Sequence, residues 1–139
     1  MDFLNQYGVR DIRRERLIRR AILIVLSVGV VAGFLYFWLK NHVQEGRVRE
    51  FLVALEAGDY PAGYSFWGCR VDSPCQNYTY NDFLEDWGPS SAFGKLQSHR
   101  FVRSRERGSG VEITMVLNEN REVKLWVEKS NGVLGFSPL

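Results

Sequence analysis

Cys69 and Cys75 are the side chains of this sequence best suited to covalent chemistry. Five residues separate them, and Asp72, Ser73 and Pro74 among these are typical of a turn. In an oxidising compartment, two cysteines this close in a turn-rich loop are expected to form a disulfide. A metal pair, a redox-active dithiol and two free thiols are the alternatives, although the spacing is not C-x-x-C and no C-x-x-C-H haem site occurs.

The remaining residues provide no motif for catalysis. The two histidines, His42 and His99, are far apart in the sequence, and neither H-E-x-x-H, G-x-S-x-G nor a glycine-rich phosphate loop occurs. A Cys/His nucleophile pair would require both cysteines to be unpaired. We therefore expect no catalytic residue, no metal site and no cofactor.

Trp126 is a candidate contact residue. Between Glu122 and Glu128, Val123, Leu125 and Val127 alternate with mostly polar residues, and Trp126 falls on the polar side. An exposed tryptophan in that position suits contact with a partner protein or a membrane surface. Cover by a loop or by a second copy of the domain is the alternative.

A basic run at residues 100–107 is a second candidate surface. It contains four arginines and is expected to surround a hairpin tip near Gly108. Such a run suits contact with lipid phosphates or an acidic partner, and the alternative is a solvated edge that discourages aggregation. The arginines are Arg100, Arg103, Arg105 and Arg107.

The hydrophobic pattern predicts the elements that position these residues. Apolar residues recur at helical spacing from Val43 to Ala57, and Gly58 is a natural stop. Residues 60–90 are irregular and aromatic, except for a short helix from Tyr80 to Trp87, which begins with a capping box at Thr79–Asp82.

After residue 94 the hydrophobic period changes to two. Strands are predicted at 95–104, 111–117, 122–128 and 133–137, separated by turns near 108–110, 118–120 and Asn131-Gly132. The last turn has the residues of a type I′ hairpin. Such short turns require antiparallel neighbours, so we expect a four-stranded meander with one face packed on the helices.

Residues Ala21 to Leu39 form a 19-residue run without a charged side chain. As a helix, this run is about 28 Å long, close to the thickness of the hydrocarbon core of a bilayer. It ends in aromatic residues and Lys40, with no small-residue cleavage pattern, which favours an uncleaved anchor over a signal peptide. We therefore predict a basic head at 1–20, a transmembrane helix at 21–39 and an outer domain at 40–139.

The charges flanking the apolar run predict its orientation. Six arginines precede the run, whereas fewer basic residues follow it closely. The positive-inside rule then places the N-terminus in the cytoplasm and the C-terminal domain outside the plasma (inner) membrane. The six arginines are expected to contact lipid headgroups, and the net charge of only +2 gives no reason to expect nucleic-acid binding. They are Arg10, Arg13, Arg14, Arg16, Arg19 and Arg20.

Gly29 and Gly33 form a G-x-x-x-G pair inside the apolar run. The two glycines lie on one helix face, one turn apart, where another helix can approach closely. A chance occurrence is the alternative, because glycine is common in membrane spans. The pair is a candidate helix-packing site for an integral membrane partner or for a homodimer.

The order of elements resembles the cystatin-like or nuclear-transport-factor-two-like α+β fold. The stretch FLVALEAGDYPAGYSFW, from Phe51 to Trp67, looks like the first helix and its exit in that superfamily. The resemblance implies either a membrane-anchored accessory domain or a pocket protein of the ketosteroid-isomerase type, with carboxylates and tyrosines in an apolar cone. Residues that could supply such groups, or simply cap helices, are Asp72, Asp82, Asp86, Tyr64, Tyr78 and Tyr80.

These observations predict an α+β protein, with one N-terminal transmembrane helix followed by helices packed on a four-stranded antiparallel sheet. The expected function is that of a non-catalytic accessory or assembly subunit of a membrane protein complex. Its expected partners are membrane lipids and one or more integral membrane proteins. A small-ligand-binding module with an aromatic pocket, or a pocket enzyme, is the alternative.

Overall fold

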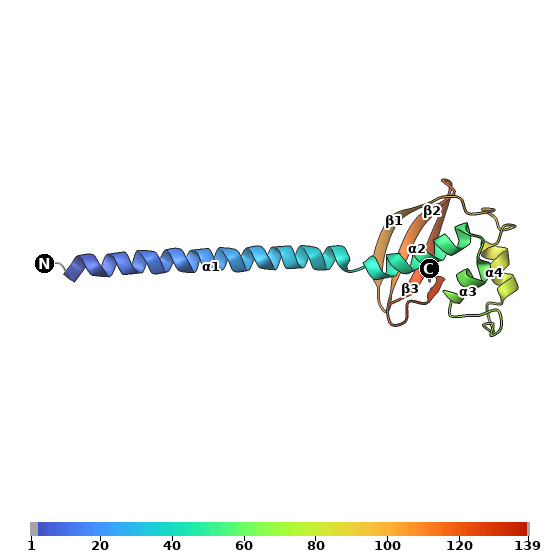
Figure 1. Cartoon of the computed structure of the whole chain (residues 1–139), viewed down its shortest axis with the longest axis horizontal. Helices are drawn as coiled ribbons and strands as arrows, with labels where there is room; N and C mark the ends of the chain where they lie inside the picture. Colours follow the sequence, from blue (N-terminus) through green and yellow to red (C-terminus); the bar gives the residue numbers. More distant parts are fainter. Residues whose placement is uncertain (1–2, 139) are drawn as a thin grey trace. The chain divides into compact units, whose positions relative to one another are not determined.

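The structure, a computed structural model, describes residues 3–138, and the side chains from residue 12 onward. It divides into two units, residues 1–40 and 41–139. The first unit is a single helix, α1 (Phe3–Leu39), and the second contains all the other elements (Figure 1). Among the described residues, one helix, near the N-terminus, is long and apolar enough to cross a membrane, by the criteria of length and composition.

The second unit, here called the outer domain, confirms the predicted α+β class. A long helix, α2 (His42–Glu56), lies across one face of an antiparallel sheet (Figure 1). The strands follow the chain in the order β1-β2-β3-β4, so the sheet is the predicted meander. Their bounds are His99–Arg107, Gly110–Leu117, Arg121–Glu128 and Leu134–Phe136.

The apolar stripe of α2 and the inner face of the sheet form the core. Val48, Phe51, Leu52 and Leu55 are buried on α2, as their spacing predicts. The inner residues of β2 and β3 are buried opposite them, and they alternate with residues that point to the outer face. These strand residues are Val111, Ile113, Met115, Leu117, Leu125 and Val127.

Two short helices connect α2 to the sheet. The second, α4 (Tyr80–Trp87), begins with the predicted capping box: the Thr79 hydroxyl accepts from the Asp82 N–H, and the Asp82 carboxylate accepts from the Thr79 N–H at 2.8 Å. The Thr79 hydroxyl also donates to the Asp82 carboxylate at 2.8 Å, and this bond, together with the one from the Thr79 N–H, holds the pKa of Asp82 below its usual value. The first, α3 (Tyr60–Ser65), was predicted as irregular chain, and that prediction is wrong.

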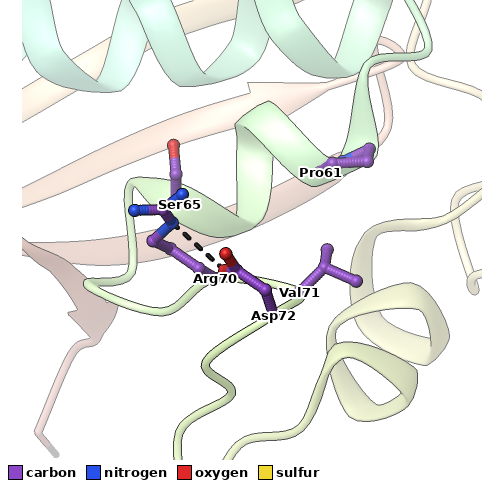
Figure 2. Close-up of a pocket in the computed structure, with 5 residues that line it drawn as sticks. All are labelled: Pro61, Ser65, Arg70, Val71 and Asp72. Atoms are coloured by element: carbon purple, nitrogen blue, oxygen red, sulfur yellow. Dashed lines mark ion pairs between the residues drawn. The ribbon is translucent and has the colours of Figure 1, made fainter.

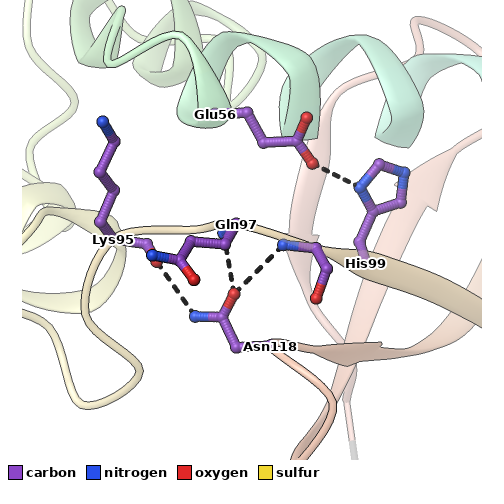
Figure 3. Close-up of polar contacts among 6 residues, drawn as sticks. Glu56, Lys95, Gln97, His99 and Asn118 are labelled. Carbon is purple, nitrogen blue, oxygen red and sulfur yellow. Dashed lines mark hydrogen bonds and ion pairs between the residues drawn. The ribbon is translucent and has the colours of Figure 1, made fainter.

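The first strand differs from its predicted range. The strand begins at His99 rather than at residue 95. Before His99, backbone groups of residues 93–98 form hydrogen bonds with the side chain of Asn118 and do not pair with a neighbouring strand. Figure 3 shows the contacts of Asn118 with Lys95 and Gln97. The strand also continues to Arg107, so the whole basic run lies within β1 and not around the hairpin tip. The predicted tip at residues 108–110 is confirmed as the β1–β2 turn.

The type I′ prediction for Asn131-Gly132 is wrong. Of these two residues only Gly132 has a positive φ, whereas a type I′ turn needs positive φ at both central positions. Two consecutive residues with positive φ, Asn118 and Glu119, instead form the β2–β3 turn. Asparagine tolerates this conformation better than most residues, which suits it to the first position.

Polar side chains of α2 form hydrogen bonds with side chains of β1, and these contacts show the direction of the helix relative to the strand. His99 Nδ1 lies 2.7 Å from the Glu56 carboxylate at the end of α2 (Figure 3). The Ser104 hydroxyl donates to the Glu45 carboxylate in the first turn of α2. The helix therefore runs antiparallel to β1, and the later half of β1 lies beside the beginning of α2.

Candidate functional site

The aromatic residues between 60 and 87 fill the core of the outer domain. Phe51 is surrounded at centroid distances of 5.0–6.3 Å by Phe66, Trp67, Phe83 and Trp87. Four of these five rings are buried. The cluster therefore lines the core of the outer domain.

The tyrosine hydroxyls of this cluster hold the neighbouring loop in place. The Tyr64 hydroxyl donates to the Tyr78 carbonyl oxygen at 2.6 Å and accepts from the Cys75 N–H at 3.3 Å. The Tyr78 hydroxyl donates to the Asp86 carboxylate at 2.9 Å. Burial, and then the nearby Asp86 carboxylate, raise the pKa of Tyr78 well above its usual value. A phenol with a raised pKa stays protonated at neutral pH and acts here as a hydrogen-bond donor.

The acidic residues considered for pocket chemistry lie outside the core. Asp82 caps α4 and Asp86 accepts from Tyr78. Asp72 is exposed and pairs with Arg70 at 3.2 Å. Tyr80 stacks on Phe83 at a centroid distance of 6.2 Å. The structure thus assigns each of these groups a local structural contact and does not bring them together in one cavity.

Cys69 and Cys75 are joined by a disulfide, with their Cα atoms 5.3 Å apart. Closing a loop of this length reduces the entropy of the unfolded chain and is worth about 2 kcal/mol in the chain-entropy model. A cavity of about 380 Å³ adjoins this loop and is lined by Pro61, Ser65 and loop residues 70–72 (Figure 2). It is a surface depression of the loop, separate from the aromatic core.

The residues predicted to act in the membrane lie on α1. Arg13, Arg14, Arg16, Arg19 and Arg20 are exposed along its first half. The side chain of Arg10 lies outside the described residues. The apolar side chains of the 21–39 stretch are exposed as well, from Ile22 to Leu39. A helix that is apolar around its whole circumference is suited to lipid or to another helix.

Gly29 and Gly33 leave an open strip on α1. A Cβ atom added at either position would meet no atom within 4 Å among the described residues. A second helix could therefore approach the α1 backbone closely along this strip. The roles of these glycines and of the arginines remain predictions.

Trp126 lies on the outer face of the sheet, opposite the core, as the alternation predicts. It is only partly exposed, because its indole ring covers Gly110 on the neighbouring strand. A Cβ added at Gly110 would come within 2.3 Å of that ring. The indole N–H donates to the Glu128 carboxylate at 3.3 Å. A contact between Trp126 and a partner, which remains a prediction, would therefore use the part of the ring that Gly110 does not cover.

The basic run forms a row along one edge of the outer face. The register pairs Arg100, Arg103, Arg105 and Arg107 with outer-face residues of β2, and all four are exposed. A shift of register between Phe101 and Arg103 keeps Arg100 on the same face as the other three. Sequence analysis named these arginines as a candidate surface but missed their common strand face, although the i, i+2 spacing of Arg103, Arg105 and Arg107 was a signal for it.

The outer face also carries a carboxylate that sequence analysis did not single out. Glu112 on β2 is nearly buried, and it accepts a hydrogen bond from the Ser137 hydroxyl. This bond, with the charges of Arg107, Lys124 and Arg105, holds the pKa of Glu112 below its usual value. The residue stays ionised and links the C-terminal segment to β2.

Comparisons of this chain with protein-family models, with curated proteins and with solved structures find no match. The resemblance to the cystatin-like or nuclear-transport-factor-two-like fold therefore rests on the order of elements and the stretch from Phe51 to Trp67. Function has to be argued from the surfaces described above.

Proposed function

We propose that this protein is a non-catalytic accessory or assembly subunit of a membrane protein complex. Its α1 helix would reside in the plasma (inner) membrane, and its outer domain would present a docking face outside the cytoplasm. The observation that carries the proposal is the packing of the outer domain. Its aromatic residues surround Phe51 and fill the core, while charged and partly exposed residues gather on the outer face of the sheet.

The exposed groups of both units support a docking role. On α1, the open strip at Gly29 and Gly33 suits a tightly packed neighbouring helix. On the outer domain, Trp126 combines a fixed ring with a partly exposed edge, and tryptophan is among the residues that contribute most to protein interfaces. The partner in this proposal is one or more integral membrane proteins, and a homodimer is the simplest variant of the same packing.

Purification of the tagged full chain in a mild detergent tests the docking proposal. We expect Gly29→Leu with Gly33→Leu to remove most of a specifically copurifying membrane protein, because each leucine would hold the two helix backbones apart. Val31→Phe adds bulk on the opposite face of α1 and should leave copurification unchanged.

The outcomes of this purification separate several interpretations. Recovery of only a second tagged copy would identify the homodimer. If neither the glycine variant nor Trp126→Ala changes what copurifies, the docking proposal fails at both candidate surfaces. Unfolding measurements on the Trp126 variant must accompany this test, because the ring also covers Gly110.

The proposed orientation has the N-terminus in the cytoplasm and the outer domain outside. We expect a reporter that is active only outside the cytoplasm to be active when fused after Leu139 and inactive when fused before Met1. The asymmetry of arginines around the apolar run is the physical reason. The same reporter can be tested in a variant that removes Arg13, Arg14, Arg16 and Arg19, which should weaken the preference. Activity of the N-terminal fusion alone would reverse the proposed topology.

A further inference from the structure

Three of the four arginines in the row on β1 form no ion pair within the described residues. Arg107 lies 3.7 Å from the Glu112 carboxylate, which the Ser137 hydroxyl already engages. Arg105 contributes to the low pKa of Glu112 without forming an ion pair with it. In the described part of the chain, Arg100 and Arg103 form no ion pair with a carboxylate and do not contribute to the lowered pKa of Glu112. Three guanidinium groups on one strand face are thus open to an external anion.

An apolar side chain lies within this row. Val102 is the extra residue of the register shift between Phe101 and Arg103, and half of its surface is exposed. A bulge on an edge strand redirects a side chain that would otherwise follow the strict alternation. The edge of β1 therefore presents an aliphatic group among arginines. This combination suits the boundary between headgroups and acyl chains of a bilayer.

The chain itself limits how far this row can lie from a membrane. Only Lys40 and Asn41 separate the end of α1 from the beginning of α2, so the Cα of His42 is at most about 11 Å from that of Leu39. The first turn of α2 is bonded to Ser104 through Glu45. Ser104 lies between Arg103 and Arg105 in β1. If α1 spans a bilayer, the short linker therefore leaves these two arginines within reach of its surface.

We propose that Arg100, Arg103 and Arg105 bind anionic phospholipid headgroups of the membrane that α1 crosses, and thereby hold the outer domain against the bilayer. Guanidinium groups bind phosphate in a bidentate manner, and the row supplies several on one face. An acidic protein surface carries the same negative charge as these headgroups and is the competing binding partner. The tether and the exposed Val102 favour the lipid, because the membrane is always within reach and has an apolar layer below its phosphates. This inference rests on the proposed membrane residence of α1 but does not require a protein partner at Gly29, Gly33 or Trp126.

The test uses the full chain in lipid nanodiscs. A fluorophore on Ser109→Cys, at the exposed β1–β2 turn, reports proximity to a quencher carried on lipid headgroups. One set of discs contains only phosphatidylcholine, and the other also contains 30 mol% phosphatidylglycerol. We expect stronger quenching with the anionic lipid and a loss of the difference in 0.5 M salt, because exposed charges are screened.

Two variants with equal loss of charge locate the binding surface. Each arginine near an anionic surface contributes about fivefold to binding, so Arg100→Gln, Arg103→Gln and Arg105→Gln together should weaken the lipid-bound state on the order of a hundredfold. The control removes three exposed basic residues outside the outer face, Arg70→Gln, Lys95→Gln and Arg121→Gln, and should retain the lipid dependence.

Three results would overturn the inference. The first is equal quenching of the unsubstituted chain in both kinds of disc, a measurement that needs no arginine variant. The second is an equal loss of the lipid dependence in both triple variants, which would mean that only net charge matters. The third is that quenching rises only when a copurified acidic protein is added, which would identify that protein as the occupant of the row.

Discussion

Replacement of Asn118 by alanine is expected to lower the free energy of unfolding of the outer domain by about 2–4 kcal/mol. Its side-chain oxygen accepts from the N–H groups of Gln97 and Ser98, at 2.8 and 3.3 Å. Its side-chain nitrogen donates to the carbonyl oxygens of Phe93 and Lys95, at 2.9 and 3.1 Å. One residue thus satisfies four backbone groups of the segment that leads into β1, and Figure 3 shows its contacts with Lys95 and Gln97. Alanine would leave all four to find water or remain unpaired.

Two further substitutions at Asn118 separate the contributions of its backbone conformation and of its side-chain hydrogen bonds to the free energy of unfolding. Asn118 has a φ of +48°, which glycine adopts without strain, so Asn118→Gly removes only the side-chain hydrogen bonds. Asn118→Asp keeps the two acceptor contacts but places a carboxylate oxygen against the carbonyls of Phe93 and Lys95. We expect Asp and Gly to be destabilising as well, and Ala to be the most destabilising of the three because it also strains the backbone.

Chemical unfolding of the full chain in detergent micelles, followed by far-ultraviolet circular dichroism, measures these differences. Asn120, in the same turn, is exposed and makes no side-chain hydrogen bond within the described residues, so Asn120→Ala is the matched control. It should change the free energy of unfolding by less than about 0.5 kcal/mol. A similarly small effect of Asn118→Ala would show that the segment before β1 is ordered by other contacts.

Local rules were sufficient for the elements whose signals lie within a few residues of one another. The α2 stripe and the α4 capping box depend on spacings of three and four residues, and both were predicted at nearly their observed bounds. The alternation of β2 and β3 likewise predicted which residues line the core. The sheet order followed because the connecting turns are too short for anything except antiparallel neighbours.

Contacts between distant residues decided one of the features that were missed. Residues 95–98 have an apolar and polar pattern that suits a strand, yet Asn118, more than twenty positions away, binds their backbone in an irregular path. The α3 helix was missed for a local reason: its N-cap is Asp59, whose carboxylate accepts from the Ala62 N–H at 3.2 Å. Asp59 and Pro61 suit a helix start as well as a turn, and the burial of Gly63 and Tyr64 favours the helix.

The candidate surfaces were only partly predictable for a related reason. The alternation of β3 correctly predicted that Trp126 lies on the outer face. It could not show that Gly110, on the neighbouring strand, has no side chain and so leaves space for the indole ring. The arginines of the basic run were recognised by their charge, but their common face depends on a register shift next to Val102. A bulge of this kind changes which residues share a face without leaving a clear pattern in the sequence.

Gly110→Ala is expected to destabilise the outer domain by about 1–3 kcal/mol, the usual cost of forcing an extra methyl group into a closely packed site. The added Cβ would come within 2.3 Å of the Trp126 ring, which would have to move. The backbone does not contribute to this cost, because Gly110 has no positive φ. Gly135 lies beside Trp126 on the other neighbouring strand, where a Cβ would meet nothing within 4 Å. Gly135→Ala is therefore the matched control and should be nearly neutral.

A double-mutant cycle tests whether the steric conflict is with Trp126. In a Trp126→Ala background, Gly110→Ala has no ring to displace, so its cost should fall by at least about 1 kcal/mol. Trp126→Ala alone should be destabilising, because it exposes the backbone at Gly110 and removes the hydrogen bond to Glu128. Unfolding of all four chains under one set of conditions gives the coupling energy. Equal costs of Gly110→Ala in both backgrounds would mean that the ring does not rest on Gly110, and that Trp126 is free to contact a partner with its whole surface.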